Sequence, residues 1–252
     1  MKALKLISLI ILTGLLVNFT NTGKVTIYTI GDSTMANKDL SQHNPERGWG
    51  QMFQQFFDDQ VIVDNWAKNG RSSKSFMTEG LWKGVLEKLK PGDFVFIQFG
   101  HNDSKPDSAR HTDPHTTYKA NLTKYITETR AKGANPVLLT SVVRRKFDAN
   151  ENLEDTHGEY LVVVRELAKE MNVPLIDMEQ KSRKLVQQLG PEESKKLYMW
   201  IEPGVSEKFP KGDKDDTHFQ VYGATKMAGL VVEGIKELNL SIASHIIKTP
   251  QN

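Results

Sequence analysis

Short apolar runs alternate along this chain with segments in which apolar residues recur at helical spacing. The runs are bounded by turn residues, as strands are, and lie at residues 26–30, 61–66, 93–99, 136–143 and 174–177. Helical spacing marks residues 47–57, 81–89, 118–132, 158–171, 181–189 and 221–238. Strands that alternate with helices through short connections form right-handed crossovers and a mostly parallel sheet with helices on both faces. The pattern therefore predicts one α/β domain.

The run at residues 93–99 is almost continuously apolar, as expected for a strand that helices cover on both faces. In such sheets, ligands bind beyond the carboxyl ends of the strands. Polar residues follow the predicted strands at 31–34, 69–73 and 100–103, and further loops follow Val143 and Met199. We expect any functional site to be built from these segments.

The first residues do not fit the domain pattern. Lys2 and Lys5 precede an uncharged apolar run from Leu6 to Val17, which is typical of a secretory signal peptide and shorter than the roughly 20 residues of a membrane span. We predict a signal peptide over residues 1–22, a domain over 23–240 and a loosely attached tail over 241–252. No small-x-small cleavage signature is visible, so an uncleaved anchor is the alternative. The prediction is an exported protein, secreted or periplasmic, with no stable membrane association once the signal is removed.

Composition excludes several classes of function. The 252 residues include no cysteine, which excludes a disulfide scaffold, a thiolate nucleophile and a cysteine-ligated zinc site. The chain has 33 basic and 31 acidic residues, and loss of Lys2 and Lys5 with the signal leaves it with no net charge. Nucleic-acid binding needs a basic field, so we expect no nucleic-acid partner.

The predicted strand ends carry residue types that acyl transfer requires. A serine hydroxyl becomes a nucleophile when a base takes its proton, a carboxylate must hold that base in one tautomer, and fixed donors must receive the oxyanion. Ser33 follows the first strand, Gly70 the second and Asn102 the third. Near the C-terminus, His218 comes three residues after Asp215, a spacing that lets the carboxylate reach Nδ1 and leaves Nε2 for Ser33.

Four short blocks occur in order along the chain: GDST at 31–34, an isolated Gly70, GHND at 100–103 and DDTH at 215–218. Together they resemble the four blocks of the GDSL, or SGNH, hydrolase superfamily. The longer stretches GDSTMA, RGWGQ, NGRSSKSF, FGHND, TSVVRRKF and DDTHFQVYGA are similar to the rhamnogalacturonan acetylesterase family. The resemblance implies a three-layer α/β/α sandwich with a flavodoxin-like, five-stranded parallel sheet, and no metal or organic cofactor.

The resemblance also implies a role for each matching residue. Ser33 is the expected nucleophile, His218 the general base and then acid, and Asp215 the carboxylate that orients it. The backbone amides of Ser33 and Gly70 and the side-chain amide of Asn102 are the expected oxyanion donors. The implied activity is removal of acetyl groups from pectic polysaccharide through an acyl-enzyme, and the implied partner is acetylated plant cell-wall polysaccharide or oligosaccharide.

Other patterns compete with this assignment. Residues 154–157, EDTH, also place an acid three residues before a histidine, but they precede a predicted helix, so capping explains them better. Three histidines in or near one loop, His101, His111 and His115, match no familiar zinc spacing, and we expect no metal. Asp216 lacks the spacing of its neighbour and is expected to be a turn or capping residue.

Residues on the same loops are candidates for substrate binding. Arg71 and Arg144 are expected to meet galacturonate carboxylates, because arginine binds a carboxylate through two parallel hydrogen bonds. A solvated surface role is the alternative for both. His101 is expected to shape the site beside Asn102. Trp200 is expected to offer a stacking face for a sugar, although large aromatic residues more often belong to the core.

The sequence therefore predicts an exported serine esterase that deacetylates rhamnogalacturonan. An esterase or lipase for other acyl chains is one alternative, although no long apolar insertion is visible for a fatty acyl chain. A carbohydrate-binding relative without catalysis is another, and the presence of Ser33, Asp215 and His218 argues against it.

Overall fold

The central element is a sheet of five parallel strands, seen in a computed structural model that describes residues 23–247. The strands are hydrogen-bonded in the order β3 (Val61–Asn65), β1 (Val25–Gly31), β4 (Phe94–Gln98), β5 (Asn135–Leu139) and β6 (Leu175–Ile176). The chain runs from β1 to one edge and then crosses back to build the other side, which is the flavodoxin-like order. The predicted sheet is confirmed, and the loops after β1 and β4 flank the crevice where such folds bind ligands.

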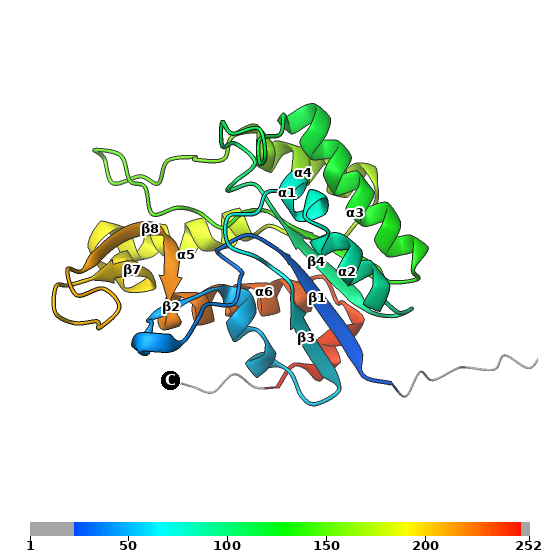
Figure 1. Ribbon diagram of the computed structural model, residues 1–252, viewed down its shortest axis with the longest axis horizontal. Coiled ribbons are helices and arrows are strands. Elements are labelled where there is room, and N and C mark those ends of the chain that lie inside the picture. Colours follow the sequence, from blue (N-terminus) through cyan, green and yellow to red (C-terminus); the bar gives the residue numbers. More distant parts are fainter. Residues whose placement is uncertain (1–22, 248–252) are drawn as a thin grey trace, which may run out of the picture.

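Helices cover both faces of this sheet and complete the three layers (Figure 1). One face is covered by α1 (Ser73–Thr78), α2 (Leu81–Lys88), α3 (Lys119–Ala131) and α4 (Glu159–Glu170). The other face is covered by α5 (Met178–Glu193) and α6 (Val221–Glu237), together with short helical turns. The short turns are η1 (Ser41–His43), η2 (Trp49–Met52), η3 (Gln54–Phe56), η4 (Pro114–Tyr118), η5 (Ser194–Leu197) and η6 (Ser241–His245).

Alternation along the strands explains why both faces need a cover. In β4, Phe94 and Phe96 point to the layer of α5 and α6, whereas Val95 and Ile97 point to the layer of α1 to α4. None of these four side chains is more than 4% exposed. Because both sides of the strand are buried, its sequence is apolar at nearly every position rather than at every second one.

A second, antiparallel sheet of three strands stands beside the first (Figure 1). In it, β8 (Asp213–Gln220) pairs with β7 (Tyr198–Ile201) on one side and with β2 (Glu46–Arg47) on the other. The hydrophobic pattern did not indicate β8, because Phe219 is the one fully buried side chain of the strand. This small sheet carries the DDTH block.

The predicted helix over residues 47–57 is wrong. That stretch consists of the end of β2 and the two 3-10 turns η2 and η3. Gly48 and Gly50 weaken a helix, and a Cβ at Gly50 would lie 2.7 Å from the Met35 carbonyl oxygen, so this segment packs directly on the chain that follows β1. The apolar positions of the segment are nevertheless core residues: Trp49, Phe53 and Phe56.

The expectation of a loosely attached tail is wrong for residues 241–247. The turn η6 buries Ile242, which is 1% exposed. Beyond it, Ile246 forms a bridge with Phe57, and the Ile247 amide donates to the Phe56 carbonyl at 3.0 Å. The C-terminal segment therefore packs on the core beside η3.

Residues 1–22 and 248–252 lie outside the described residues, so the signal peptide stays a prediction. Between residues 23 and 247, no helix has the length and apolar character needed to cross a membrane.

Candidate active site

The loops after β1, β3 and β4 meet the end of β8 at one cleft of about 500 Å³. Ser33, Gly70 and Asn102 line it from the large sheet, and Asp215 and His218 line it from the small one. The predicted catalytic and oxyanion residues are thus brought together, although they come from distant parts of the sequence. Ser33, Gly70 and Asn102 meet because parallel strands end at the same edge of a sheet. Asp215 and His218 reach the cleft because β8 pairs with β7.

His218 lies between Ser33 and Asp215 and contacts both. Its Nε2 is 2.8 Å from the Ser33 Oγ, and its Nδ1 is 2.6 Å from the Asp215 Oδ2. Since a carboxylate only accepts, Nδ1 carries the proton and Nε2 is left as the acceptor for the serine hydroxyl. The three side chains form one hydrogen-bonded chain that leads from the carboxylate to the serine.

Asp215 is held ionised by its own turn. Its Oδ1 accepts hydrogen bonds from the backbone amides of Thr217, at 2.6 Å, and His218, at 3.1 Å. Burial would raise the pKa of this carboxyl, but the His218 ring and the two amides outweigh it and lower the pKa to about 2. The carboxylate therefore keeps its charge at any pH near neutrality.

A tight turn presents Ser33 at the end of β1. Asp32 is fully buried, and its Oδ1 accepts hydrogen bonds from the Thr34 amide at 2.9 Å and the Thr34 hydroxyl at 2.8 Å. Gly31 approaches β4 so closely that a Cβ there would lie 2.7 Å from the Gln98 carbonyl oxygen. Asp32 thus organises the turn, and Ser33 is the residue that reaches the cleft.

The three expected oxyanion donors belong to residues that line the same cleft. In the described part of the chain, the backbone amides of Ser33 and Gly70 make no hydrogen bond to another protein group. Gly70 has a φ of 76°, a left-handed conformation that glycine adopts without strain. The side-chain nitrogen of Asn102 donates to the Arg71 carbonyl at 3.1 Å, which leaves its second hydrogen without a partner among residues 23–247.

A buried carboxylate ties the Asn102 loop to the next helix. Asp103 accepts hydrogen bonds from the Ser73 amide and hydroxyl, the Gly100 amide and the Thr112 hydroxyl, at 2.6 to 3.2 Å. Burial raises the pKa of Asp103 to about 6, although the hydrogen bonds from Ser73 and Thr112 act to lower it. Ser73 is the first residue of α1, a helix that the sequence pattern did not indicate and that begins with a capping box between Ser72 and Ser75.

Three of the candidates for substrate binding, Arg71, Arg144 and His101, do not line the cleft. Arg71 pairs with Glu79 at 2.7 Å, through the guanidinium group that was expected to bind a substrate carboxylate. Arg144 points inward and donates to the carbonyls of His101, at 3.2 Å, and Thr156, at 3.1 Å. His101 is 3% exposed and lies behind the cleft wall.

Trp200 and Asp216 lie on the opposite face of the small sheet from Asp215. Paired strand residues share a face, and Met199, which lines the cleft, pairs with Asp215. The Trp200 ring instead has Arg145 4.6 Å from its centre, and its Nε1 donates to Asp216 Oδ1 at 2.7 Å. Two predictions are therefore wrong: Trp200 does not offer a stacking face in the cleft, and Asp216 is an ion-pair partner rather than a cap.

Sequence reasoning missed several residues that line the cleft. Lys38 is almost buried and donates to Asn69 at 2.8 Å while pairing with Glu46 at 2.7 Å. Arg110 pairs with Asp107 outside the cleft at 2.7 Å. The remaining residues missed in the lining are Lys105, Met199, Phe209 and Asp213. Lys105 follows the GHND block by two residues, and Phe209 lies in the loop after Met199 that the sequence pattern marked, whereas Lys38 had no such signal.

The three loop histidines, His101, His111 and His115, each contact a different partner. His111 contacts the Lys105 carbonyl at 3.1 Å, and His115 pairs with Glu159 at 2.9 Å. His101 contacts His157 at 3.0 Å instead. Over residues 23–247, no three histidine or acidic side chains are grouped as metal ligands.

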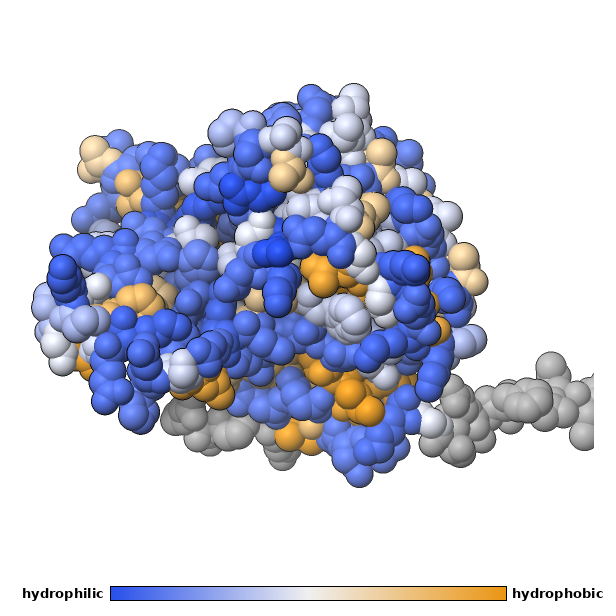
Figure 2. All heavy atoms as spheres, in the orientation of Figure 1, coloured by the Kyte–Doolittle hydropathy of each residue, from blue (hydrophilic) through white to orange (hydrophobic). Residues whose placement is uncertain are grey.

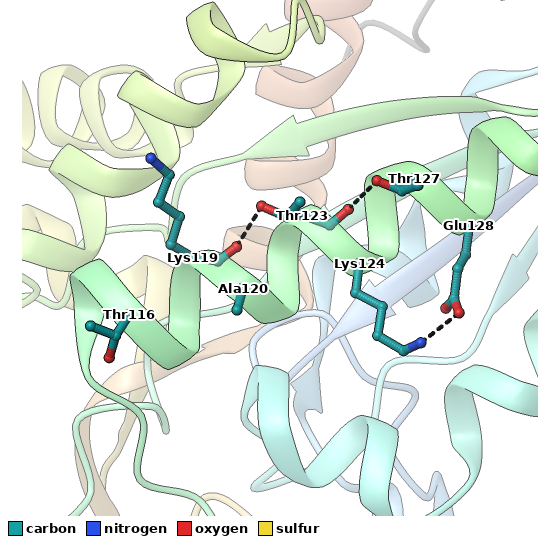
Figure 3. A pocket seen from close by; sticks show the side chains of 7 residues that line it. All are labelled: Thr116, Lys119, Ala120, Thr123, Lys124, Thr127 and Glu128. Atoms are coloured by element: carbon teal, nitrogen blue, oxygen red, sulfur yellow. Dashed lines mark hydrogen bonds and ion pairs between the residues drawn. The ribbon is translucent and has the colours of Figure 1, made fainter.

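A second depression runs along the exposed side of η4 and α3 (Figure 3). Its threonine hydroxyls donate back to helix carbonyls, Thr123 to Lys119 and Thr127 to Thr123, both at 2.8 Å, and Lys124 pairs with Glu128 at 2.6 Å. These polar groups satisfy one another, and the depression shares no residue with the cleft at Ser33. The cleft is therefore the candidate active site.

A flavodoxin-like sheet with Ser33, Gly70 and Asn102 at its carboxyl edge, and with His218 facing Ser33 from the small sheet, defines the SGNH class of ester hydrolases. The comparison with known families agrees: this chain belongs to the GDSL-like lipase/acylhydrolase family, whose profile matches residues 29–224. It is 44% identical over 224 residues to the rhamnogalacturonan acetylesterase RhgT of Bacillus subtilis (strain 168), a match that covers 88% of this chain and 94% of RhgT.

Solved structures show the same fold. The crystal structure of protein YxiM from Bacillus subtilis matches with a TM-score of 0.75 and 29% identity, over 86% of this chain and 58% of YxiM. A variant of Axe2, an acetyl-xylooligosaccharide esterase from Geobacillus, matches with a TM-score of 0.60 and 20% identity, over 84% of this chain and 95% of that one. The protein is thus a carboxylic ester hydrolase of the GDSL type.

Proposed function

We propose that this protein removes acetyl groups from pectic polysaccharide, with rhamnogalacturonan as its substrate, through an acyl-enzyme on Ser33. The observation that carries the mechanism is the hydrogen-bonded chain from Asp215 through His218 to Ser33, at 2.6 and 2.8 Å. The similarity to RhgT, named a rhamnogalacturonan acetylesterase, supports the choice of substrate.

In the first half of the proposed reaction, Ser33 Oγ attacks the acetyl carbonyl carbon while His218 Nε2 takes the hydroxyl proton. The carbonyl oxygen becomes an oxyanion, which accepts hydrogen bonds from the Ser33 and Gly70 amides and from Asn102. Each such donor contributes about 3 to 4 kcal/mol to transition-state stabilisation. The intermediate then collapses, and His218 returns the proton to the departing sugar hydroxyl.

In the second half, water replaces the sugar. His218 takes a proton from the water as its oxygen attacks the acetyl-Ser33 ester, and the same donors hold the second oxyanion. Collapse releases acetate, and the proton returns to Ser33 Oγ. Asp215 stays ionised throughout and holds the ring in the required tautomer.

Polar character of the cleft supports a sugar substrate rather than a fatty acyl ester. Its lining contains the charged side chains of Lys38, Glu46, Lys105, Arg110 and Asp213. Lys105 makes no ion pair with another described residue and is exposed, so its ammonium is the group we assign to a uronate carboxylate. On the face that Figure 2 shows, hydrophobic side chains form small separate groups within a mostly hydrophilic surface.

Export, which the pattern of residues 1–22 predicts, would bring the enzyme to an extracellular polymer. We propose it on that pattern alone.

The proposal is tested by measuring acetate release from acetylated rhamnogalacturonan, homogalacturonan and xylan, and phenol release from aryl esters of rising acyl-chain length. We expect the fastest release from rhamnogalacturonan and none from long-chain esters, with Ser33→Ala inactive on all of them. Lys105→Gln is expected to raise KM about threefold to tenfold on the uronate polymers and to leave xylan and aryl acetate unchanged. A preference for long acyl chains would overturn the substrate, and an active Ser33→Ala would overturn the mechanism.

A further inference from the structure

Two buried histidines lie directly behind the cleft, and the proposed reaction uses neither. His101 precedes Asn102 in the loop after β4, and His157 lies in the segment before α4. His157 Nε2 is 3.0 Å from His101 Nδ1, and the two rings meet edge to face with centres 4.5 Å apart. The side chains are 3% and 7% exposed. The bond therefore joins two segments that are 56 residues apart in the chain, away from water.

Arg144 joins the same two segments through their backbone. It donates to the His101 carbonyl at 3.2 Å and to the Thr156 carbonyl at 3.1 Å. The His101 carbonyl belongs to the peptide bond that leads into Asn102. Two contacts, one on the His101 ring and one on this peptide, thus hold the residue immediately before the proposed oxyanion donor.

The histidine pair is a neutral hydrogen bond rather than a charged one. Burial lowers the pKa of both rings, and the nearby Arg144 adds to it. For His157 the pKa falls to about 3, although Asp155 opposes the shift. One ring therefore donates and the other accepts at any pH at which an esterase works.

Asn102 is held from its other sides as well. Its side-chain nitrogen donates to the carbonyl of Arg71, the residue after Gly70, at 3.1 Å. Its backbone carbonyl accepts a hydrogen bond from the Lys105 amide at 3.1 Å. From behind the loop, the His157 ring contacts the His101 side chain and Arg144 contacts the His101 carbonyl. Of these two contacts, the one from His157 holds the His101 side chain itself.

We propose that His157, acting through His101, is a positioning residue that holds the Asn102 amide at the oxyanion of the proposed esterase reaction. The inference rests on the proposed function, because it needs Asn102 to contact the oxyanion. It predicts an effect on the chemical step and not on substrate binding, since the oxyanion exists only after attack.

The test separates the hydrogen bond from the packing of the ring. His157→Phe keeps an aromatic ring for the edge-to-face contact but removes the polar bond, and His157→Gln restores a polar group. We expect His157→Phe to lower kcat on an aryl acetate about 10- to 100-fold with KM within twofold. His157→Gln should recover most of the loss, and His115→Phe, at an exposed histidine paired with Glu159, should match the parent.

A double-mutant cycle shows whether the effect passes through Asn102. In an Asn102→Ala background, His157→Phe should lower kcat no further. Additive losses, or a His157→Phe variant with lower thermal stability and unchanged kcat, would overturn the inference. Should His157→Phe fail to fold, the cycle is run with Arg144→Gln, which removes the bond to the His101 carbonyl.

The outcome also distinguishes this inference from the proposed function. If Asn102→Ala has full activity while Ser33→Ala is inactive, Asn102 is no oxyanion donor and the inference fails with it. If Ser33→Ala is active, the proposed mechanism itself fails. If both variants behave as expected and His157→Phe has the parental kcat, only the positioning role is overturned.

Discussion

Two tetrapeptides of almost identical sequence, EDTH at 154–157 and DDTH at 215–218, place their histidines in different environments in this fold. The first histidine, His157, is 7% exposed and lies behind the cleft. The second, His218, has a side chain 28% exposed and lies in the cleft against Ser33. Both motifs place an acid three residues before the histidine, so spacing alone does not separate them.

The difference lies in what each acid meets. Asp215 contacts the His218 ring at 2.6 Å at a register shift in the small sheet, where Met199 pairs with Asp215 but its neighbour Tyr198 pairs with Phe219. Glu154 instead pairs with Lys146 at 2.6 Å, and the next residue, Asp155, accepts the amides of His157 and Gly158 before α4. Asp155 thus organises the approach to the helix, although the N-cap is Gly158. The same local motif thus pairs its acid with its histidine at 215–218, whereas at 154–157 the histidine ring contacts His101 instead.

The largest expected contrast between the two motifs is in activity. His218→Ala removes the proposed base and should lower kcat by a factor on the order of 10⁴ to 10⁶, as loss of a triad base does. His157→Gln should lower kcat less than tenfold. Both values come from steady-state hydrolysis of an aryl acetate, and the comparison fails if the two variants are equally impaired.

The second contrast is between the neighbouring acids. Asp215→Asn should lower kcat about 10⁴-fold, because the amide favours the wrong tautomer of His218. Asp216→Asn should change kcat less than tenfold but reduce the free energy of unfolding by about 1 to 3 kcal/mol, because the buried Arg145 loses its ionic partner. Kinetics and urea denaturation of both variants measure this. Equal kinetic losses would mean that the choice of Asp215 is wrong.

The smallest effect concerns stability against pH. Burial first, and then Arg144 and Arg183, lower the folded-state pKa of His157 to about 3, from an unfolded value near 6.5. Between these values the unfolded chain binds a proton that the folded chain does not, so this contribution is lost as the pH falls from 6.5 towards 3. The parent should therefore lose up to about 1.4 kcal/mol more stability per pH unit than His157→Gln in this window. Parallel urea-denaturation curves from pH 4 to 7 would contradict this.

Much of the site was predictable because strand ends carry a strong signal. Ser33, Gly70 and Asn102 each follow a predicted strand, and the five-stranded order brings them to one edge. Asp215 and His218 were predictable as a pair from spacing. The substrate contacts were not, since Arg71 meets Glu79, and Arg144 meets two carbonyls that no local pattern places beside it.

By itself, the sequence determined the layers of the fold and the chemical groups of the site. Buried strands and helical faces are marked by their own hydrophobic periodicity, which depends only on neighbours along the chain. The sequence favoured His218 over His157, because a predicted helix follows residues 154–157, but only the tertiary structure shows that His218 contacts Ser33 and that His157 is buried against His101. The partner of each histidine ring depends on the pairing of β8 with β7 and on contacts between segments up to 185 residues apart. A local sequence pattern cannot specify either of these.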